Sequence, residues 1–411
     1  MTYSARLLRS LGVAPHRAIA SAKEHPAIAW AHSGLMTLTG PKDGESLVCP
    51  VPIATCADET LAALASIAPE HALDDLRGSS LLTERAAISG FSRNGAVSPG
   101  RGTWLLDTRD GVIGVSLTRD DDWTLVPAWL ETDVEPTWDL VRRTAATRTL
   151  HDLVERGRLL GLAVAPSVPP PSGSVSWFAV PLSLRERGRG EGRRAPRVVD
   201  LSSLWAGPLC TRLLQRCGAD VIKVESLQRP DGARRGPAQF FELMNEGKKN
   251  VAFDFANPAD LARLREMIAG ADIVIEASRP RALRQLGIDA GALIAANPRI
   301  TWISLTGYGR DDPQAQWIAY GDDAGVAAGL SYVMQQAHGQ RVIVGDAIAD
   351  PLTGMHAALA AWASFQSGGG RLIALSLVDV VRHCIQFDLP KGADAMRARV
   401  REWNDVLAEV A

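Results

Sequence analysis

The chain has 411 residues, of which 46% are hydrophobic and 22% are charged. This composition is typical of a globular protein with room for two domains, and a net charge of −2 gives no basic field for nucleic acid or an anionic membrane. No apolar run approaches the roughly 18 residues of a membrane helix, and the N-terminus lacks a signal-peptide pattern. We therefore expect a cytoplasmic protein.

The cysteines and histidines form no recognisable disulfide or metal-binding pattern. The five cysteines are odd in number and include no CxxC pair, so we expect free buried thiols in a reducing compartment. The eight histidines include no HxxxH or HExxH unit, so the sequence predicts no metal site.

The N-terminal part of the chain predicts two units of different character. Residues 24–66 are rich in alanine and predict helix. Residues 103–118 predict two strands around an Asp-Gly turn, and residues 137–161 predict one charged amphipathic helix. We therefore expect a helical segment over residues 1–90 that completes the large domain, followed by a small α+β domain over residues 91–165.

Residues 166–196 predict a linker. They begin PSVPPPSGSV and continue into the arginine-rich LRERGRGEGRRAPR. Pro, Ser and Gly disfavour regular structure there, and the like charges repel one another. A phosphate-binding arm is the alternative, because arginine suits phosphate, although no interleaved aromatic residues indicate a nucleic acid strand.

Strands and helices alternate regularly from residue 197 onward. The predicted strands are short and apolar, and they lie at 197–202, 219–225, 249–255, 272–277 and 299–309. Helices are predicted between them, with proline near the first turn of two. Continuously apolar strands that alternate with helices indicate an α/β fold, with a parallel Rossmann-like sheet flanked by helices over residues 197–411.

The candidate catalytic residue is Asp350, in the segment GDAIADPLTG. Proline is favoured at the first helical position, so Pro351 places Asp350 at the N-cap of a helix. A capping aspartate only stabilises its helix, by about 1 kcal/mol. The same helix terminus keeps the carboxylate ionised, and an ionised carboxylate can attack an activated acyl group. The spacing alone leaves both interpretations open.

Five segments in this order resemble CoA-transferase family III, which includes formyl-CoA:oxalate and carnitine CoA-transferases and α-methylacyl-CoA racemase. They are VVDLSSLWAGPLCTRLLQRCGADVIKVES (198–226), NEGKKNVAFDF (245–255), ADIVIEASRPRALRQLGI (271–288), NPRITWISLTGYG (297–309) and ADPLTGMHAAL (349–359). In this resemblance the family's catalytic aspartate falls on Asp350.

The resemblance implies an enzyme that moves CoA from an acyl-CoA thioester to a carboxylic acid through an aspartyl intermediate. It implies CoA as a substrate, a homodimer, and no role for a metal. The best candidate for a CoA contact is Lys248, for which a solvated charge at a strand start is the alternative. The further candidates are Gly207, Arg229, Arg279 and Arg284.

Tyr320 stands at the position where the family's racemases have histidine. The formyl-CoA transferase also has tyrosine at this position. This favours a transferase, because racemisation needs an acid/base partner opposite the aspartate. The neighbouring Asp322 and Asp323 are either a solvated turn or site residues. The Gly-rich loop 92–102 is the candidate for oxyanion stabilisation, with an ordinary loop as the alternative.

The order of the segments departs from the family, in which the small domain follows the sheet domain. Residues 33–64 also echo residues 328–359, and Thr55 takes the place of Asp350 in this first copy. Threonine cannot form the acyl anhydride, so we expect Asp350 to be the chain's single nucleophile. Two alternatives stay open: another acyl-CoA enzyme on the same fold (an isomerase, racemase or lyase), or a non-catalytic CoA-binding subunit.

Overall fold

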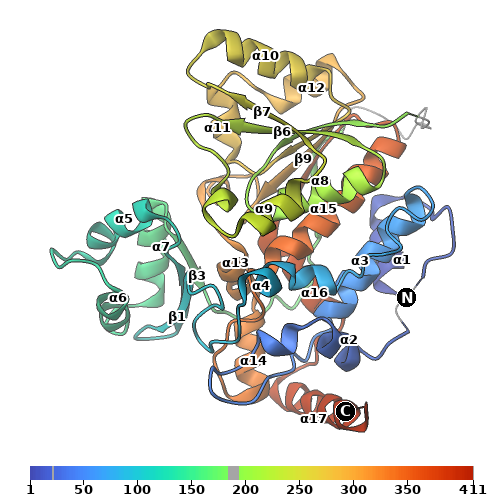
Figure 1. The fold of residues 1–411 in the computed structure, drawn as a ribbon. Helices are drawn as coiled ribbons and strands as arrows, with labels where there is room; N and C mark the ends of the chain where they lie inside the picture. The colour runs from blue at the N-terminus through green and yellow to red at the C-terminus, as the bar shows by residue number, and fades with distance from the viewer. Residues whose placement is uncertain (21–22, 184–193, 411) are drawn as a thin grey trace.

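The computed structural model describes residues 1–20, 23–183 and 194–410. It shows a large α/β domain and a small α+β domain that projects from one side, at the left in Figure 1. None of the helices in these ranges is both long enough and apolar enough to cross a membrane.

Seven strands form the central sheet, in the order β4-β10-β9-β8-β5-β6-β7. They are β4 (Ala179–Ser183), β5 (Arg197–Leu201), β6 (Asp220–Ser226), β7 (Lys249–Phe253), β8 (Ile273–Glu276), β9 (Thr301–Thr306) and β10 (Arg371–Ser376). Every neighbouring pair is parallel except β4, which is antiparallel to β10. The predicted α/β class with a parallel sheet is confirmed.

The direction of the strand order reverses between β5 and β8. From β5 the chain adds β6 and β7 on one side, and then β8, β9 and β10 on the other. In such sheets, ligands bind outside the carboxyl ends of the strands at the reversal point. The helix that follows β5 is α8 (Ala206–Arg216), so its N-terminus lies at this point.

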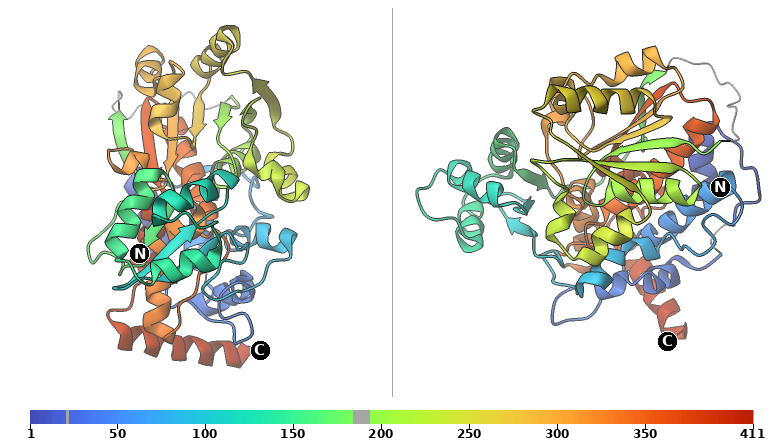
Figure 2. Two further views of the ribbon diagram at one scale, coloured as in Figure 1. Left: turned by 90° about the vertical axis from the view of Figure 1, so that its left-hand side faces the viewer. Right: turned by 45° about the horizontal axis from the view of Figure 1, so that its top comes forward.

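Helices cover both faces of the sheet, as continuously apolar strands require (Figure 2). Strand β8 shows the alternation: Val274 belongs to one buried cluster, whereas Ile273 and Ile275 belong to the other. The first face is covered by α10 (Pro258–Ala269), α11 (Pro280–Gln285) and α12 (Ala290–Ala296). The second is covered by α8, α15 (Ala349–Gln366) and α16 (Leu377–Phe387).

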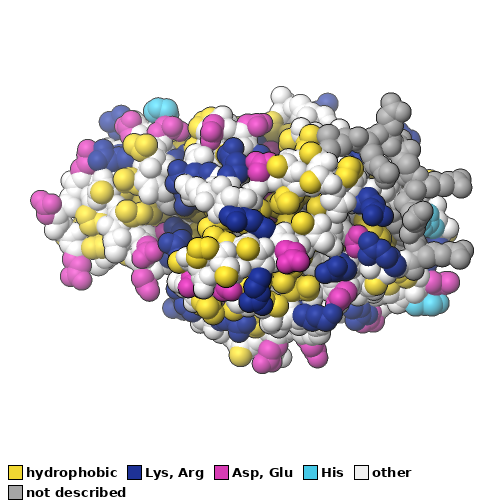
Figure 3. Space-filling view, turned by 90° about the horizontal axis from the view of Figure 1, so that it is seen from above, with side chains coloured by type: hydrophobic (Ala, Val, Ile, Leu, Met, Phe, Trp, Pro, Cys, Tyr) yellow, Lys and Arg dark blue, Asp and Glu magenta, His cyan; other side chains and the backbone are white. Residues whose placement is uncertain are grey.

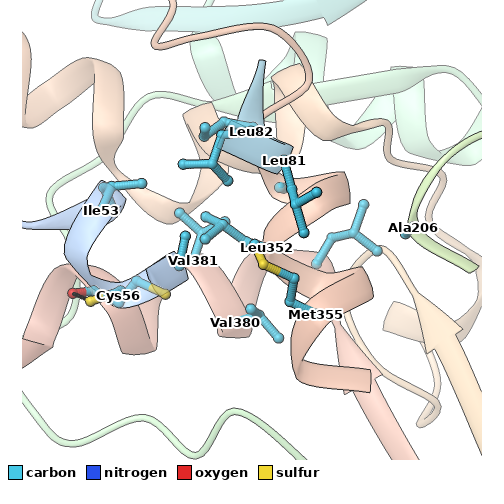
Figure 4. Packing of buried hydrophobic residues seen from close by; sticks show 14 of the residues in the cluster. Ile53, Cys56, Leu81, Leu82, Ala206, Leu352, Met355, Val380 and Val381 are labelled. Atoms are coloured by element: carbon cyan, nitrogen blue, oxygen red, sulfur yellow. Dashed lines mark hydrogen bonds between the residues drawn. The ribbon is translucent and has the colours of Figure 1, made fainter. Parts of the chain in front are cut away.

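The first 90 residues share the core of the second face. Their helices are α1 (Tyr3–Leu11), α2 (Pro26–His32), α3 (Ile53–Ile67) and α4 (Glu84–Ser89). Figure 4 shows Ile53 and Cys56 of α3 in one cluster with Leu352 of α15 and Val381 of α16. Residues near the two ends of the chain therefore bury one another, and all five cysteines are free and buried, as predicted.

Residues 24–66 are less helical than predicted. Between α2 and α3 the chain forms one short 3-10 turn (Leu35–Thr37) and otherwise irregular backbone. Gly40, with a φ of 131°, and the prolines of this stretch interrupt the helical pattern.

The small domain has an antiparallel sheet in the order β1-β2-β3, covered by three helices. These elements are β1 (Thr103–Asp107), β2 (Val112–Ser116), α5 (Asp120–Leu130), α6 (Trp138–Ala145), α7 (Leu150–Leu160) and β3 (Ala163–Pro166). The predicted hairpin is confirmed as β1 and β2. The single helix predicted over 137–161 was wrong, because Thr149 starts a new helix by accepting the Asp152 N–H at 3.1 Å.

The predicted linker over 166–196 was wrong in part, because it contains β4. This short strand pairs with β10, whose backbone would otherwise leave an open sheet edge. The arginine-rich stretch from residue 184 to 193 lies outside the described residues. The remaining helices are α9 (Ala238–Asn245), α13 (Gly321–Ala328), α14 (Leu330–His338) and α17 (Ala393–Val410).

Candidate active site

Asp350 is the second residue of α15, not its N-cap as the spacing suggested. The helix begins at Ala349, two residues before the predicted first position Pro351. Pro351 is tolerated in the first turn because the N–H groups there have no intrahelical partner. The Asp350 N–H donates to the Ala347 carbonyl at 2.9 Å. Ala347 has a φ of 45°, in the left-handed region that residues with a Cβ rarely adopt. The turn before α15 is therefore strained, and it fixes where Asp350 lies.

Three helix N-termini converge on the Asp350 carboxylate. The first belongs to its own helix, and the second to α8, whose first residue Ala206 directs its backbone N–H toward the carboxylate. The third belongs to α13, since a Cβ added to Gly321 would lie 2.3 Å from Asp350 Oδ2. Helix N-termini favour negative charge, so the arrangement stabilises the carboxylate anion and any negative charge that develops beside it.

One arginine, Arg85, interacts with a group of buried acidic residues around Asp350. Arg85, from α4, donates to both carboxylate oxygens of the fully buried Asp346, at 2.7 Å from Nε and 2.5 Å from the terminal nitrogen. Burial opposes the charge of Arg85, but the carboxylates of Asp346, Asp322 and Asp350 together raise its pKa. A single guanidinium therefore faces three carboxylates, which cannot all be ionised without repulsion.

Burial raises the pKa of Asp350 to about 7. The Arg85 guanidinium and the Ala206 N–H act in the opposite direction, while Asp322 and Asp346 raise the pKa further. Burial, followed by the charge of Asp346, also raises the pKa of Asp322 to about 6. The Asp350 carboxyl therefore changes its charge near neutral pH, the range suited to a group that reacts reversibly.

Asp322 and Asp323 are buried and do not form a solvated turn. Asp322 Oδ1 accepts the Ala347 N–H at 2.7 Å, which holds the strained turn before α15. Asp323 Oδ1 accepts the Ser116 hydroxyl at 2.8 Å and the Tyr320 N–H at 2.9 Å, and burial raises its pKa to about 7. The pair joins the N-terminus of α13 to the small domain on one side and to α15 on the other.

The structure brings the loop 92–102 to the same acids. The Ser98 hydroxyl lies beside the Asp322 carboxylate and accepts the Thr103 N–H at 3.1 Å. A Cβ added to Gly100 would lie 3.8 Å from a terminal nitrogen of Arg85. Within the described part of the chain the Gly100 N–H makes no hydrogen bond, so it is free to bind a ligand oxygen.

Tyr320 directly precedes α13 and lies at the junction with the small domain. Burial raises the pKa of its hydroxyl, which lies near Thr118 and Arg119. No hydrogen bond joins Tyr320 to Asp350 among the described residues. The side chain is therefore placed to shape the entrance from the small domain rather than to exchange a proton with Asp350.

Lys248 and Gly207 have structural surroundings. The Lys248 ammonium is fully buried and donates to Asp200, Pro208, Thr211 and Asn245, at 2.7–3.3 Å. It is neither solvated nor open to a ligand. A Cβ added to Gly207 would lie 2.0 Å from the Ser202 hydroxyl oxygen, so this glycine allows α8 to pack closely after β5. We leave both out of the proposed CoA contacts.

Two of the arginine candidates meet at the carboxyl end of the sheet. Arg229 follows β6 and Arg279 follows β8, the two neighbours of β5. Burial and then the charges of Arg281, Arg119 and Arg229 lower the pKa of Arg279. We call Arg119, Arg229, Arg279 and Arg281 the arginine cluster.

In the described part of the chain, only Arg119 of this cluster has an acidic partner, Asp122. Lys and Arg side chains gather near the junction of the two domains in Figure 3. Arg284 lies elsewhere, on a separate cavity of about 230 Å³ that it lines with Glu276 and Arg310. The arginine cluster is therefore a region of excess positive charge that does not include Arg284.

The substitution Gly321→Ala is expected to disrupt the site. The new methyl group would lie 2.3 Å from both the Ala347 carbonyl oxygen and Asp350 Oδ2, so α13 would move away from α15. Overpacking of this kind costs about 1–3 kcal/mol. Urea denaturation should show this loss, and Gly325→Ala on the same helix, which meets only the Ile348 and Leu330 side chains at 3.2 Å or more, should show less. Equal stability of the two variants would contradict the close contact.

The model of CoA-transferase family III matches residues 195–407. The chain belongs to CoA-transferase family III. This family III chain is 31% identical over 201 residues to the succinate–glutarate CoA-transferase of Agrobacterium fabrum, with 45% of the chain and 50% of that protein covered. It is 28% identical over 220 residues to a formyl-CoA:oxalate CoA-transferase of Bradyrhizobium diazoefficiens, with 51% of each covered.

A crystal structure of a CaiB/BaiF family protein from Brucella suis gives a TM-score of 0.43 at 28% identity, over 46% of this chain and 54% of that one. The family III chain spans about half the length of the curated relatives it matches. Arg85 and the loop 92–102 lie outside the residues that match the family. The contribution of the N-terminal segment to the site therefore rests on this structure and not on the family match.

Proposed function

We propose that this chain transfers CoA from an acyl-CoA thioester to a carboxylic acid, with Asp350 as the acyl-accepting nucleophile. The observation that carries the proposal is the convergence of three helix N-termini on the buried Asp350 carboxylate, with the Ala206 N–H directed toward it. A carboxylate held there is kept partly as the anion despite its burial. The relatives' names include succinate, glutarate and oxalate, so we propose a small dicarboxylic acid as acceptor.

The reaction begins when an Asp350 oxygen attacks the thioester carbonyl. The C–S bond breaks, CoA leaves as the thiolate, and the acyl group remains as a mixed anhydride. The thiolate then attacks the aspartyl carbonyl, which releases the donor acid and leaves CoA on Asp350 as a thioester. The acceptor carboxylate attacks this thioester and repeats the two steps in reverse order, which restores the free Asp350 carboxylate.

Charge develops on an oxygen in each of these attacks, and the site has donors for it. The Ala206 N–H of α8 is directed toward Asp350, the N-terminus of α13 packs against its carboxylate, and the unpaired Gly100 N–H lies near Arg85. Preorganised backbone donors of this kind are a large contribution to acyl transfer. Because Gly100 lies outside the residues that match the family, its role is part of the proposal.

The arginine cluster supports a site for the phosphates of CoA. Arg229 and Arg279 follow the strands on either side of β5, and Asp350 faces the helix that follows β5. Guanidinium groups bind phosphate with paired hydrogen bonds, and in the described residues Arg229, Arg279 and Arg281 lack acidic partners. We therefore propose that CoA extends from the cluster to Asp350.

The proposal is tested by CoA exchange. The full chain is incubated with succinyl-CoA and isotopically labelled glutarate, and labelled glutaryl-CoA is measured by mass spectrometry. Product that depends on added glutarate supports a transferase. Consumption of succinyl-CoA without any acceptor acid would instead indicate hydrolysis or another acyl-CoA reaction, and CoA binding without turnover across a panel of acids would indicate a non-catalytic subunit.

The rate of Asp350 acylation is expected to rise with pH around neutrality. The nucleophile is the anion, and burial raises the pKa of Asp350 to about 7. Raising the pH from about 6 to about 8 should therefore increase the initial labelling rate about tenfold, since the ionised fraction rises across this range. Stopped-time labelling with succinyl-CoA measures it, and a rate that falls over this range would contradict the assignment.

The assembly and the division of the chain are also proposals. We propose a homodimer, and we propose that residues 1–90 complete the large domain. The second proposal is supported by the shared core of α3, α15 and α16, and by Arg85, which α4 brings to Asp346. Light scattering tests the first, and co-purification of separately expressed residues 1–165 and 166–411 tests the second.

A further inference from the structure

A small cavity at the junction of the two domains has unusual electrostatics. Its volume is about 220 Å³, and it lies between α7 of the small domain, the loop after β9 and the first turns of α16. One wall is Ala327 on α13, six residues beyond Gly321, which places the cavity about 9 Å along that helix from the Asp350 contact. The cavity is therefore distinct from the candidate active site.

Arg158 is a cation with almost no partner in this cavity. Its side chain is only 11% exposed, and its guanidinium lies 3.7 Å from the centroid of the Trp317 ring. Its acidic contact is Glu155 at 3.5 Å, which is itself 55% exposed. The Arg158 Nε is buried with no hydrogen-bond partner in the described part of the chain. A buried charge without a partner is costly, so this position favours an anion beside it.

Two other polar atoms of the cavity share this condition. The Arg382 Nε is also buried without a hydrogen-bond partner among the described residues, and the buried Tyr308 hydroxyl, which makes no hydrogen bond of good geometry there, faces the Arg158 guanidinium. The rest of the Arg382 guanidinium contacts Asp379 and the Ala327 carbonyl, each at 3.2 Å. The cavity lining thus holds two guanidinium groups, the Tyr308 hydroxyl and one carboxylate, that of Asp379, while the acidic contact of Arg158, Glu155, is largely exposed and lies outside the lining.

The shape of the cavity and its remaining lining residues restrict the class of ligand that it can bind. A carboxylate is planar and accepts paired hydrogen bonds from a guanidinium and a further bond from a hydroxyl. Val168, Val378 and Pro166 add apolar surface, and the volume corresponds to about seven water molecules. This is more room than a bare oxyanion needs, and it suits a short carbon chain.

We propose that this cavity binds a small organic carboxylate, held by Arg158, Tyr308 and Arg382. The ligand joins α7 of the small domain to α16 of the large domain. A free carboxylate bound here links the position of the small domain, and with it the loop 92–102, to the concentration of carboxylic acid. The inference goes beyond the proposed reaction and does not depend on it.

The test uses the full chain carrying Asp350→Asn, so that no acyl chemistry intervenes. Succinate and inorganic phosphate are each titrated by calorimetry, and tryptophan fluorescence is recorded with and without Trp317→Phe. Succinate is expected to bind saturably and to change a fluorescence signal that Trp317→Phe removes. Arg158→Gln and Tyr308→Phe should each weaken binding tenfold or more, whereas Arg156→Gln, whose partners are Glu131 and Ala128, should not.

A Trp317-dependent fluorescence change with succinate that is unchanged in both Arg158→Gln and Tyr308→Phe would overturn the inference, because succinate bound as an acceptor near residue 350 does not contact Trp317. A Trp317-dependent fluorescence change that phosphate produces at concentrations as low as succinate does would overturn the carboxylate assignment. If Arg158→Gln does not fold, Tyr308→Phe carries the test, because it removes a single oxygen atom. A failure here leaves the labelling of Asp350 by succinyl-CoA unaffected, so the two proposals are separable.

Discussion

Replacing Asp350 with asparagine is expected to abolish covalent labelling by succinyl-CoA and to lower CoA transfer by about 10³-fold or more. The amide keeps the size of the side chain and can accept the Ala206 N–H, but it has no anionic oxygen to attack a thioester. Hydroxylamine converts an acylated or CoA-bearing aspartate into the hydroxamate, and borohydride reduces its thioester to the alcohol. Peptide mass spectrometry after either reagent locates the modified residue.

The fold is expected to survive this substitution. The pKa of Asp350 is raised to about 7 in the folded state, so folding binds protons between about pH 4 and about pH 7 and is opposed as the pH rises through this range. The asparagine variant should therefore lose less stability than the wild type between these pH values. Asp405→Asn, on an exposed position of α17, is the matched control and should change neither labelling nor stability. Labelling of the Asp350→Asn variant at the wild-type rate would exclude Asp350 as the nucleophile.

The sheet could be predicted because its signals are local. Each of the strands β5 to β9 is a short apolar run between helix signals, and proline marks the starts of α10 and α11. β4 has no such signal, since Ala179–Ser183 is largely exposed and becomes a strand only by pairing with β10. The single helix predicted over 137–161 failed because the helical periodicity runs across Thr149. The Thr149 side chain caps the start of a second helix there, and periodicity alone does not reveal this break.

The surroundings of Asp350 could not be predicted in the same way. Arg85 and Asp346 are 261 positions apart in sequence, and no local pattern connects them. Asp346 itself had a signal, since it lies one helical turn before Asp350 in the segment already singled out. For Lys248 the family pattern indicated a ligand contact, whereas folding surrounds its ammonium with four acceptors. The sequence therefore singled out the proposed nucleophile but not the charged residues that surround it.

The similarity between residues 33–64 and residues 328–359 extends to their backbone conformation. Gly34 and Gly329 both have left-handed φ values, 83° and 105°, and each is followed by leucine and a helical turn. Further along, α3 carries Thr55 where α15 carries Asp350, and the two helices pack in one core. The Thr55 hydroxyl is buried without a hydrogen-bond partner in the described residues. These features agree with the predicted partial duplication, in which the first copy would carry threonine in place of the acid.

Arg85→Met is expected to weaken both the fold and the chemistry. It leaves the fully buried Asp346 without its cation, and breaking such a pair costs about 3–5 kcal/mol. The Arg85 side chain is 30% exposed, so we expect the lower end of this range. The guanidinium also lowers the pKa of Asp350, so its loss should raise that pKa above about 7 and slow labelling at neutral pH. Urea denaturation and the pH profile of labelling measure the two effects.

The double variant Arg85→Met, Asp346→Asn separates these effects. Removing both charges of a buried pair costs much less than removing one, so the double variant should recover most of the lost stability. It also removes one of the carboxylates that raise the pKa of Asp350, so its pH profile should lie between those of the wild type and Arg85→Met. An unchanged pH profile in Arg85→Met would mean that Arg85 only holds Asp346 in place. A shifted profile would mean that the N-terminal segment, which lies outside the part of the chain that matches the family, sets the charge of the nucleophile.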